Sequence, residues 1–271
     1  MERRVLGSTG LTVPVIGMGT WRTFDVRGAA AEARVKEILS AALDLGVHLF
    51  DSSPMYGEAE RVLGAALADA RERALVATKI WTRSVEEGRA QAQRALSWFG
   101  GRVDLYQVHN LVSWREQLAM LEALQREGSV EAIGATHYSS SSFGELADVM
   151  RTGRITAIQV PYNPRERDIE RTILPLAADL NLGVVIMRPF GEGSLIRAAP
   201  SRKDLASLEE FGVTTWPQAL LKWVLSDSRC HVAIPATASL AHLEDNVAAG
   251  SPPWFDDEQR TYVARLVDRA R

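Results

Sequence analysis

The sequence has a single cysteine, Cys230, and no long apolar run among its 271 residues. One thiol cannot form an internal disulfide or supply a zinc site built from several cysteines, so we expect a buried structural thiol in a reducing compartment. No apolar stretch approaches the ~20 residues that a transmembrane helix needs. Arg3 and Arg4 lie near the start, but Thr12 and Pro14 interrupt the segment after them and argue against a twin-arginine export signal. We therefore expect a cytoplasmic protein with no membrane partner.

A strong charge of one sign is missing too. The 31 basic and 34 acidic residues give a formal net charge of -3 at pH 7. Nucleic-acid-binding proteins usually have a basic excess, so we expect no nucleic-acid partner. The five histidines show no spacing of a metal-ligand pair, so we expect no metal site. Hydrophobic residues make up 46% of the chain, which excludes a disordered protein.

Short apolar segments recur along the chain and are interpreted as buried strands. They cover residues 15–18, 47–50, 74–77, 103–108, 132–135, 157–160, 183–187 and 231–234. Because these segments lack strict alternation, we expect strands that are covered on both faces, as in a parallel sheet. Segments with helical spacing of apolar residues lie between or after them, over residues 31–45, 58–70, 86–99, 116–126, 169–180, 202–211, 215–225 and 256–270.

The spacing of the strand ends predicts the architecture. Six of the seven gaps match one βα unit of ~30 residues, and the last gap is longer by roughly one helix. This pattern predicts an α/β protein in which residues 1–271 form a single (β/α)8 TIM barrel with one or two extra helices, rather than a doubly wound sheet. Residues 4–13 carry Gly7, Gly10 and alternating polarity, which predicts an N-terminal β-hairpin across the barrel floor.

The residues that close the strands should converge at one mouth of such a barrel, where active sites form. Asp51, Lys79 and His109 end three consecutive strands, and Tyr56 follows Asp51 by five residues. A phenol with a pKa of ~10 is a poor acid at neutral pH, but a nearby ammonium group lowers that pKa. Asp51 would hold Lys79 in place, and His109 could hydrogen-bond a carbonyl oxygen. Each residue alone has an ordinary structural explanation, so the catalytic interpretation depends on their shared position.

An ordered series of motifs resembles the aldo-keto reductases. The series comprises residues 6–14 (Leu-Gly-Ser-Thr-Gly-Leu-Thr-Val-Pro), 17–21 (Gly-Met-Gly-Thr-Trp), 51–58, 78–79, 104–109 (Asp-Leu-Tyr-Gln-Val-His), 158–163 (Ile-Gln-Val-Pro-Tyr-Asn) and 234–235. The resemblance implies a barrel that binds NADP(H) in extended form and reduces aldehydes or ketones by hydride transfer from nicotinamide C4. By position, it implies that Tyr56 is the general acid, Lys79 lowers the pKa of Tyr56, Asp51 pairs with Lys79, and His109 orients the substrate carbonyl.

The same resemblance implies a cofactor site at the barrel mouth. The chain lacks G-x-G-x-x-G after its first strand, which disfavours a Rossmann domain. The implied contacts to the nicotinamide and pyrophosphate are Gly19, Thr20, Trp21, Thr136, His137, Gln159, Met187, Arg188, Pro189, Phe190, Gly191, Gly193, Ser194 and Leu195. The implied contacts to the adenosine end are Pro235, Ala236, Thr237, Ser239, His242, Asp245 and Asn246. NADP-binding relatives often carry arginine where this chain has His242, so NAD(H) is an alternative to NADP(H).

The substrate is expected to be a small carbonyl compound or alcohol. Trp21, Trp81 and Asn110 lie just beyond strand ends and are expected to contact it. The segment after Asn246 is short, which predicts an open pocket with broad acceptance. Two other functions stay open, a non-redox barrel enzyme with Lys79 as a Schiff-base lysine and a nucleotide-binding protein that senses redox state. We expect a monomer or a weak homo-oligomer, and the physiological substrate and favoured direction stay open.

Overall fold

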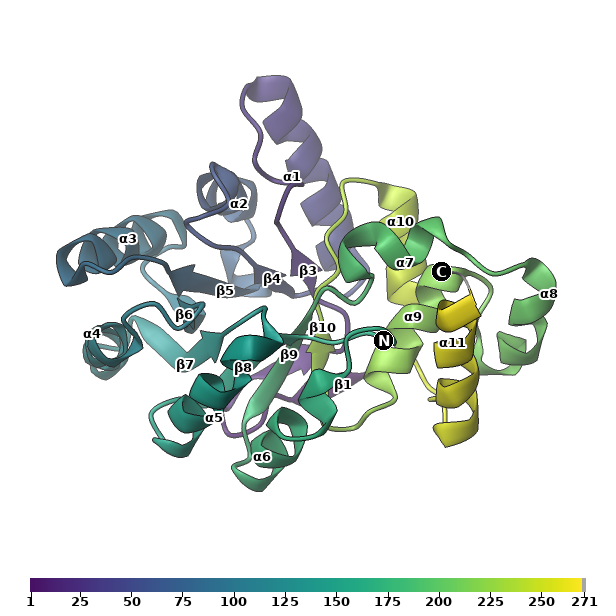
Figure 1. The fold of residues 1–271 in the computed structure, drawn as a ribbon. Helices are drawn as coiled ribbons and strands as arrows, with labels where there is room; N and C mark the ends of the chain where they lie inside the picture. Colours follow the sequence, from purple (N-terminus) through teal and green to yellow (C-terminus); the bar gives the residue numbers. More distant parts are fainter. Residues whose placement is uncertain (270–271) are drawn as a thin grey trace.

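The computed structural model describes residues 1–269, which form an eight-stranded parallel sheet surrounded by helices (Figure 1). The strands are β3 (Met18–Gly19), β4 (Leu49–Asp51), β5 (Leu75–Ile80), β6 (Val103–His109), β7 (Val130–Thr136), β8 (Ala157–Pro161), β9 (Gly183–Met187) and β10 (Val232–Ala233). Their order in the sheet follows the chain. Parallel bridges from Ile16 to Ala233 and from Gly19 to Ala236 join the first strand to the last. The predicted barrel is therefore confirmed.

The helices form an outer layer around the strands. They are α1 (Ala29–Asp44), α2 (Ala59–Leu67), α3 (Val85–Trp98), α4 (Trp114–Arg126), α5 (Phe143–Arg151), α6 (Ile173–Asp179), α7 (Ser194–Arg197), α8 (Arg202–Leu205), α9 (Trp216–Leu225), α10 (Leu240–Ala248) and α11 (Asp257–Arg269). Each predicted helical segment is found, although residues 206–211 form a 3-10 helix and α6 begins four residues late, with η3 (Asp168–Glu170) before it. The last position of the predicted helix 256–270 lies outside the described residues. Helix α5 was not predicted, although Leu146, Val149 and Met150 form a buried face on it.

A hairpin of β1 (Arg3–Val5) and β2 (Thr12–Pro14) closes the floor of the barrel, as predicted. Leu6 and Val13 are fully buried and pack with the inward-facing apolar side chains of the strands. Gly7 has a positive φ of 52°, and a Cβ there would overlap the Gly183 amide at the start of β9. The close approach of hairpin and barrel therefore requires glycine at this position.

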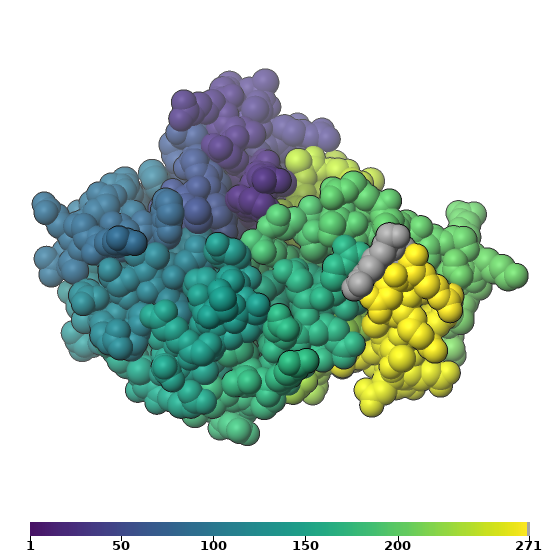
Figure 2. Space-filling view, viewed as in Figure 1, coloured from purple at the N-terminus to yellow at the C-terminus, as the bar shows by residue number. Residues whose placement is uncertain are grey.

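The last helix lies against the side of the barrel rather than over its mouth. In Figures 1 and 2, α11 lies beside the segment that contains α8, and the Tyr262 hydroxyl donates a hydrogen bond to the Asp204 carbonyl at 2.8 Å.

Within residues 1–269, no helix has the length and apolar character needed to cross a membrane.

Candidate functional site

A cavity of about 600 Å³ opens at the C-terminal ends of the strands, where barrel enzymes place their chemistry. Three of the four predicted catalytic residues line it, namely Asp51, Tyr56 and His109. Predicted cofactor and substrate contacts also line it: Gly19, Thr20, Trp21, Asn110, Gln159, Met187, Arg188, Pro189, Phe190, Gly193, Pro235 and Ala236. The sequence analysis did not assign seven other lining residues: Arg22, Thr23, Met55, Tyr138, Glu192, Ile196 and Ile234.

Lys79 lies below this cavity and is fully buried. Its Nζ donates to both carboxylate oxygens of Asp51, at 2.7 and 2.8 Å, and to the Ser52 carbonyl at 2.6 Å. Asp51 Oδ1 also accepts a hydrogen bond from Gln159 Nε2 at 2.9 Å. Burial alone would lower the pKa of Lys79, but Asp51, the Tyr56 phenol and Glu60 outweigh it and raise the pKa. The site therefore keeps a permanent ammonium group.

Tyr56 lies directly above that ammonium. Lys79 Nζ is 5.4 Å from the centre of the phenol ring. Burial has the largest effect on the pKa of Tyr56 and raises it. Among the smaller effects, the positive charges of Lys79 and Arg188 lower this pKa, and the negative charge of Asp51 raises it. Lys79 thus acts in the expected direction, but desolvation of the phenolate is larger and the net pKa is raised. In this state Tyr56 keeps its proton at neutral pH.

His109 faces Tyr56 edge-on, with ring centroids 6.1 Å apart and an interplanar angle of 88°. Its Nδ1 is 2.9 Å from the buried Ser53 hydroxyl, a partner that the sequence analysis missed. Burial lowers the pKa of His109 to about 2, and the charge of Lys79 and the neighbouring His137 act in the same direction. The imidazole is therefore neutral at physiological pH and has one donor and one acceptor nitrogen.

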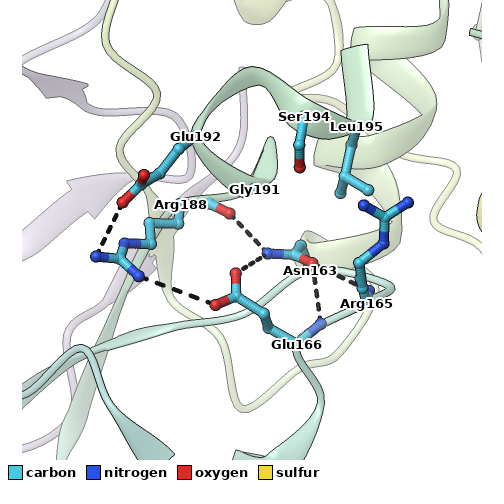
Figure 3. A pocket seen from close by; sticks show the side chains of 8 residues that line it. All are labelled: Asn163, Arg165, Glu166, Arg188, Gly191, Glu192, Ser194 and Leu195. Carbon is cyan, nitrogen blue, oxygen red and sulfur yellow. Dashed lines mark hydrogen bonds and ion pairs between the residues drawn. The ribbon is translucent and has the colours of Figure 1, made fainter. Parts of the chain in front are cut away.

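A second cavity of about 300 Å³ adjoins the first and shares Arg188 and Glu192 with it (Figure 3). Glu192 Oε1 is 2.9 Å from the Arg188 guanidinium, and Glu166 Oε1 is 4.0 Å from it. Arg188 also lies over the Tyr138 ring, 5.0 Å from its centre. The predicted cofactor residues Gly191, Ser194 and Leu195 line this second cavity rather than the first.

The remaining predicted residues line neither cavity. Thr136 is buried at the end of β7, and its Oγ1 has no hydrogen-bond partner within residues 1–269. His137 stacks on Tyr138 with centroids 5.3 Å apart, and Trp81 is exposed on the surface. The others lie before or on α10: Thr237, Ser239, His242, Asp245 and Asn246.

Two residues at this predicted adenosine end have structural partners. Ser239 is the N-cap of α10 and accepts from the His242 amide. Asp245 accepts hydrogen bonds from Thr215 and Gln218 at the start of α9, at 2.9 and 2.7 Å. These hydrogen bonds join α10 to α9, so the Asp245 carboxylate already has partners within the protein.

The profile of the Aldo/keto reductase family matches residues 15–268. A methylglyoxal reductase of Escherichia coli is 26% identical over 259 residues, which cover 92% of this chain and 89% of that protein. An aldo-keto reductase of Bacillus subtilis is 31% identical over 218 residues, which cover 72% of this chain and 64% of that protein. The crystal structure of a Klebsiella pneumoniae aldo/keto reductase with NADP and acetate has a TM-score of 0.83 at 26% identity, covering 98% of this chain and 95% of that one.

Proposed function

The chain belongs to the aldo/keto reductase family, and from this premise we propose that it is an NADP(H)-dependent oxidoreductase that reduces aldehydes or ketones to alcohols. The observation that carries the proposal is the fully buried Lys79 ammonium, paired with Asp51 and 5.4 Å from the ring centre of Tyr56. The Klebsiella pneumoniae relative, solved with NADP, supports the choice of cofactor. NAD(H) is the alternative.

The chain offers polar groups that fit a nicotinamide cofactor. Among residues 1–269 the buried Thr136 hydroxyl at the end of β7 has no hydrogen-bond partner, and a buried polar group normally has one. Gln159 presents an amide at the floor of the cavity, and Arg188 supplies a cation at its edge. These three residues would hold the cofactor. When bound, reduced nicotinamide supplies the hydride for carbonyl reduction.

The residues of the chain supply the proton and the orientation. Tyr56, which keeps its proton because burial raises the pKa of its phenol, donates that proton to the carbonyl oxygen of the substrate. Lys79 stays charged and stabilises the resulting phenolate. Ser53 Oγ accepts from the Met55 amide at 3.3 Å and can direct its own proton to His109 Nδ1. His109 Nε2–H then becomes the donor that orients the carbonyl.

Replacing the proposed acid tests this function. Tyr56→Phe should lower the rate of NADPH oxidation with 4-nitrobenzaldehyde or methylglyoxal by about 10²–10⁴-fold, the range typical for a lost general acid. Tyr138→Phe is the matched control, because it removes the hydroxyl of another phenol lining the same cavity and should lower the rate far less. Cofactor titration by tryptophan fluorescence shows whether the variants still bind NADPH. Wild-type turnover in Tyr56→Phe would contradict the proposal.

The two other functions predict different results. A Schiff-base lysine needs a lowered pKa, whereas Lys79 is held as an ammonium by three oxygen atoms and its pKa is raised. Borohydride with a carbonyl compound should therefore fail to trap Lys79. A regulatory protein would bind NADPH without turnover, so the absence of aldehyde reduction by the wild type, with binding intact, would favour sensing over catalysis.

A further inference from the structure

The charges that line the main cavity do not cancel. Asp51 is neutralised by Lys79 beneath it, and Glu192 is paired with Arg188 at 2.9 Å. Arg22 also lines this cavity, and within residues 1–269 no carboxylate lies within 4.0 Å of its guanidinium. Arg22 is therefore a cation of the cavity lining that no carboxylate of the described residues neutralises.

Arg22 is held in a defined position. Its guanidinium lies over the ring of Trp21, 4.2 Å from the ring centre. A tight turn supports the pair, because the Thr23 and Phe24 amides both donate to the Thr20 carbonyl, at 3.2 and 3.1 Å. Phe24 is fully buried and anchors this turn in the core. Arg22 itself has a positive φ of 62°, a conformation that a non-glycine residue keeps only where its surroundings impose it.

Much of the lining of the cavity that Arg22 shares is apolar. Trp21, Met55, Tyr138 and Ile196 all line the cavity and are exposed to solvent. A ligand with an apolar body would cover these side chains, whereas its polar groups need partners at its two ends. Tyr56 and His109 would bind a carbonyl at one end.

We propose that Arg22 binds a carboxylate at the other end of the substrate, so that the preferred substrates are apolar carbonyl compounds with a remote carboxylate group. The guanidinium lies over the Trp21 ring, and within residues 1–269 none of its N–H groups makes a side-chain hydrogen bond or ion pair, so they can bind a carboxylate with two parallel hydrogen bonds. Arg188 is less suited to bind the substrate carboxylate, because it pairs with Glu192 and is one of the residues proposed to hold the cofactor. This inference rests on the proposed function, since it names the substrate class of the same site.

The test compares two aldehydes that differ in charge. 4-Carboxybenzaldehyde carries the anion, and methyl 4-formylbenzoate is its neutral ester. The ratio of their kcat/KM values, acid over ester, should fall roughly three- to ten-fold in Arg22→Leu, the range between an exposed ion pair and a charge-assisted bidentate one. Arg22→Lys should give an intermediate ratio, because lysine keeps the charge but lacks the planar fork. Added salt should lower the wild-type ratio.

Arg27→Leu is the matched control. Arg27 is a nearby exposed arginine that pairs with Glu58 at 2.9 Å and does not line the cavity. The variant changes the net charge by the same amount as Arg22→Leu, and its acid-to-ester ratio should equal that of the wild type. A ratio that falls equally in both variants would show a general effect of net charge and overturn the inference.

A binding measurement separates this inference from the proposed function. Tryptophan fluorescence should show that 4-(hydroxymethyl)benzoate binds the wild type more tightly than its methyl ester does, and that Arg22→Leu abolishes the difference. If the wild type reduces both aldehydes but Arg22→Leu leaves the ratio unchanged, the inference is wrong and the proposed function stands. If the wild type reduces neither aldehyde, the proposed function fails, and the binding preference alone decides the inference. A raised KM for NADPH with an unchanged ratio would assign Arg22 to a cofactor phosphate and overturn the inference.

Discussion

At the scale of single residues, two adjacent side chains of β5 each contact a buried carboxyl group, one inside the barrel and one on its outer face. Lys79 points into the barrel and pairs with Asp51. Its neighbour Thr78 points to the outer face, where its hydroxyl donates to Glu60 on α2 at 2.6 Å. Glu60 is nearly inaccessible to solvent, and burial raises its pKa to about 7, although Thr78, Lys79 and Arg94 oppose this effect. A titratable group therefore contacts the residue next to Lys79, the lysine of the proposed active site.

The raised pKa of Glu60 predicts that the free energy of unfolding falls as the pH rises. Its pKa of about 7 in the folded protein is above the ordinary value of 4.5, so the folded state binds more protons between those values. The contribution of Glu60 is fully present below about pH 4.5 and is lost as the pH rises through 7. Glu60→Gln should therefore gain stability relative to the wild type between pH 5 and pH 8, measured by urea unfolding. Glu37→Gln, on the exposed face of α1, should show no such trend; equal trends in both variants would contradict the prediction.

At the scale of elements, the hairpin of β1 and β2 closes the barrel floor and adds buried side chains to the layer packed inside it. Leu6 is fully buried there, whereas the adjacent Val5 is 61% exposed. Leu6→Ala should lower the free energy of unfolding by about 2–5 kcal/mol, because it leaves a cavity in a closed layer. Val5→Ala, at the exposed neighbouring position, should change it by less than about 0.5 kcal/mol. Urea denaturation measures both, and equal losses would show that the hairpin contributes little to the core.

The elements were largely predictable because each strand is a short apolar run between helices of regular spacing. Helix α5 is hard to recognise because it has only nine residues and follows four serines at residues 139–142 that carry no apolar pattern. Three of the proposed catalytic residues, Asp51, Lys79 and His109, could be found because they lie at strand ends. Arg22 and Tyr138 could not, since they enter the cavity through loop conformations that no periodicity encodes. Ser53 was missed because its contact with His109 spans 56 positions.

At the scale of the whole molecule, the N-terminal segment and the segment before α11 are both fastened near α9. Arg4 donates to the carbonyls of Leu225 and Cys230, at 3.0 and 2.6 Å. Trp254 donates from Nε1 to Glu2 at 2.8 Å. Between them lies Lys222 on α9, 1% exposed, whose Nζ donates to the Ser251 and Pro253 carbonyls at 2.6 and 2.9 Å. A buried ammonium on α9 therefore holds the segment between α10 and α11 in place.

The lowered pKa of Lys222 predicts that the free energy of unfolding rises at alkaline pH, which is opposite in sign to the effect of Glu60. Burial lowers the pKa of Lys222 to about 8, below the usual value of 10.5, so the folded state binds fewer protons between these values. Raising the pH from 8 toward 10 should stabilise the wild type relative to Lys222→Met, which cannot titrate. At pH 7 that variant should already be less stable, because the two carbonyls lose their donor.

Urea unfolding at pH 7 and pH 9.5 measures the difference in free energy between wild type and variant, which should widen at the higher pH. Lys203→Met, at an exposed position on α8, is the control and should show no widening. A difference that stays constant or narrows would mean that the two carbonyls hold Lys222 charged as firmly as water does in the unfolded chain. In that case the ammonium would fasten the chain ends at no cost from burial, and the alkaline stability of the barrel would have to arise elsewhere.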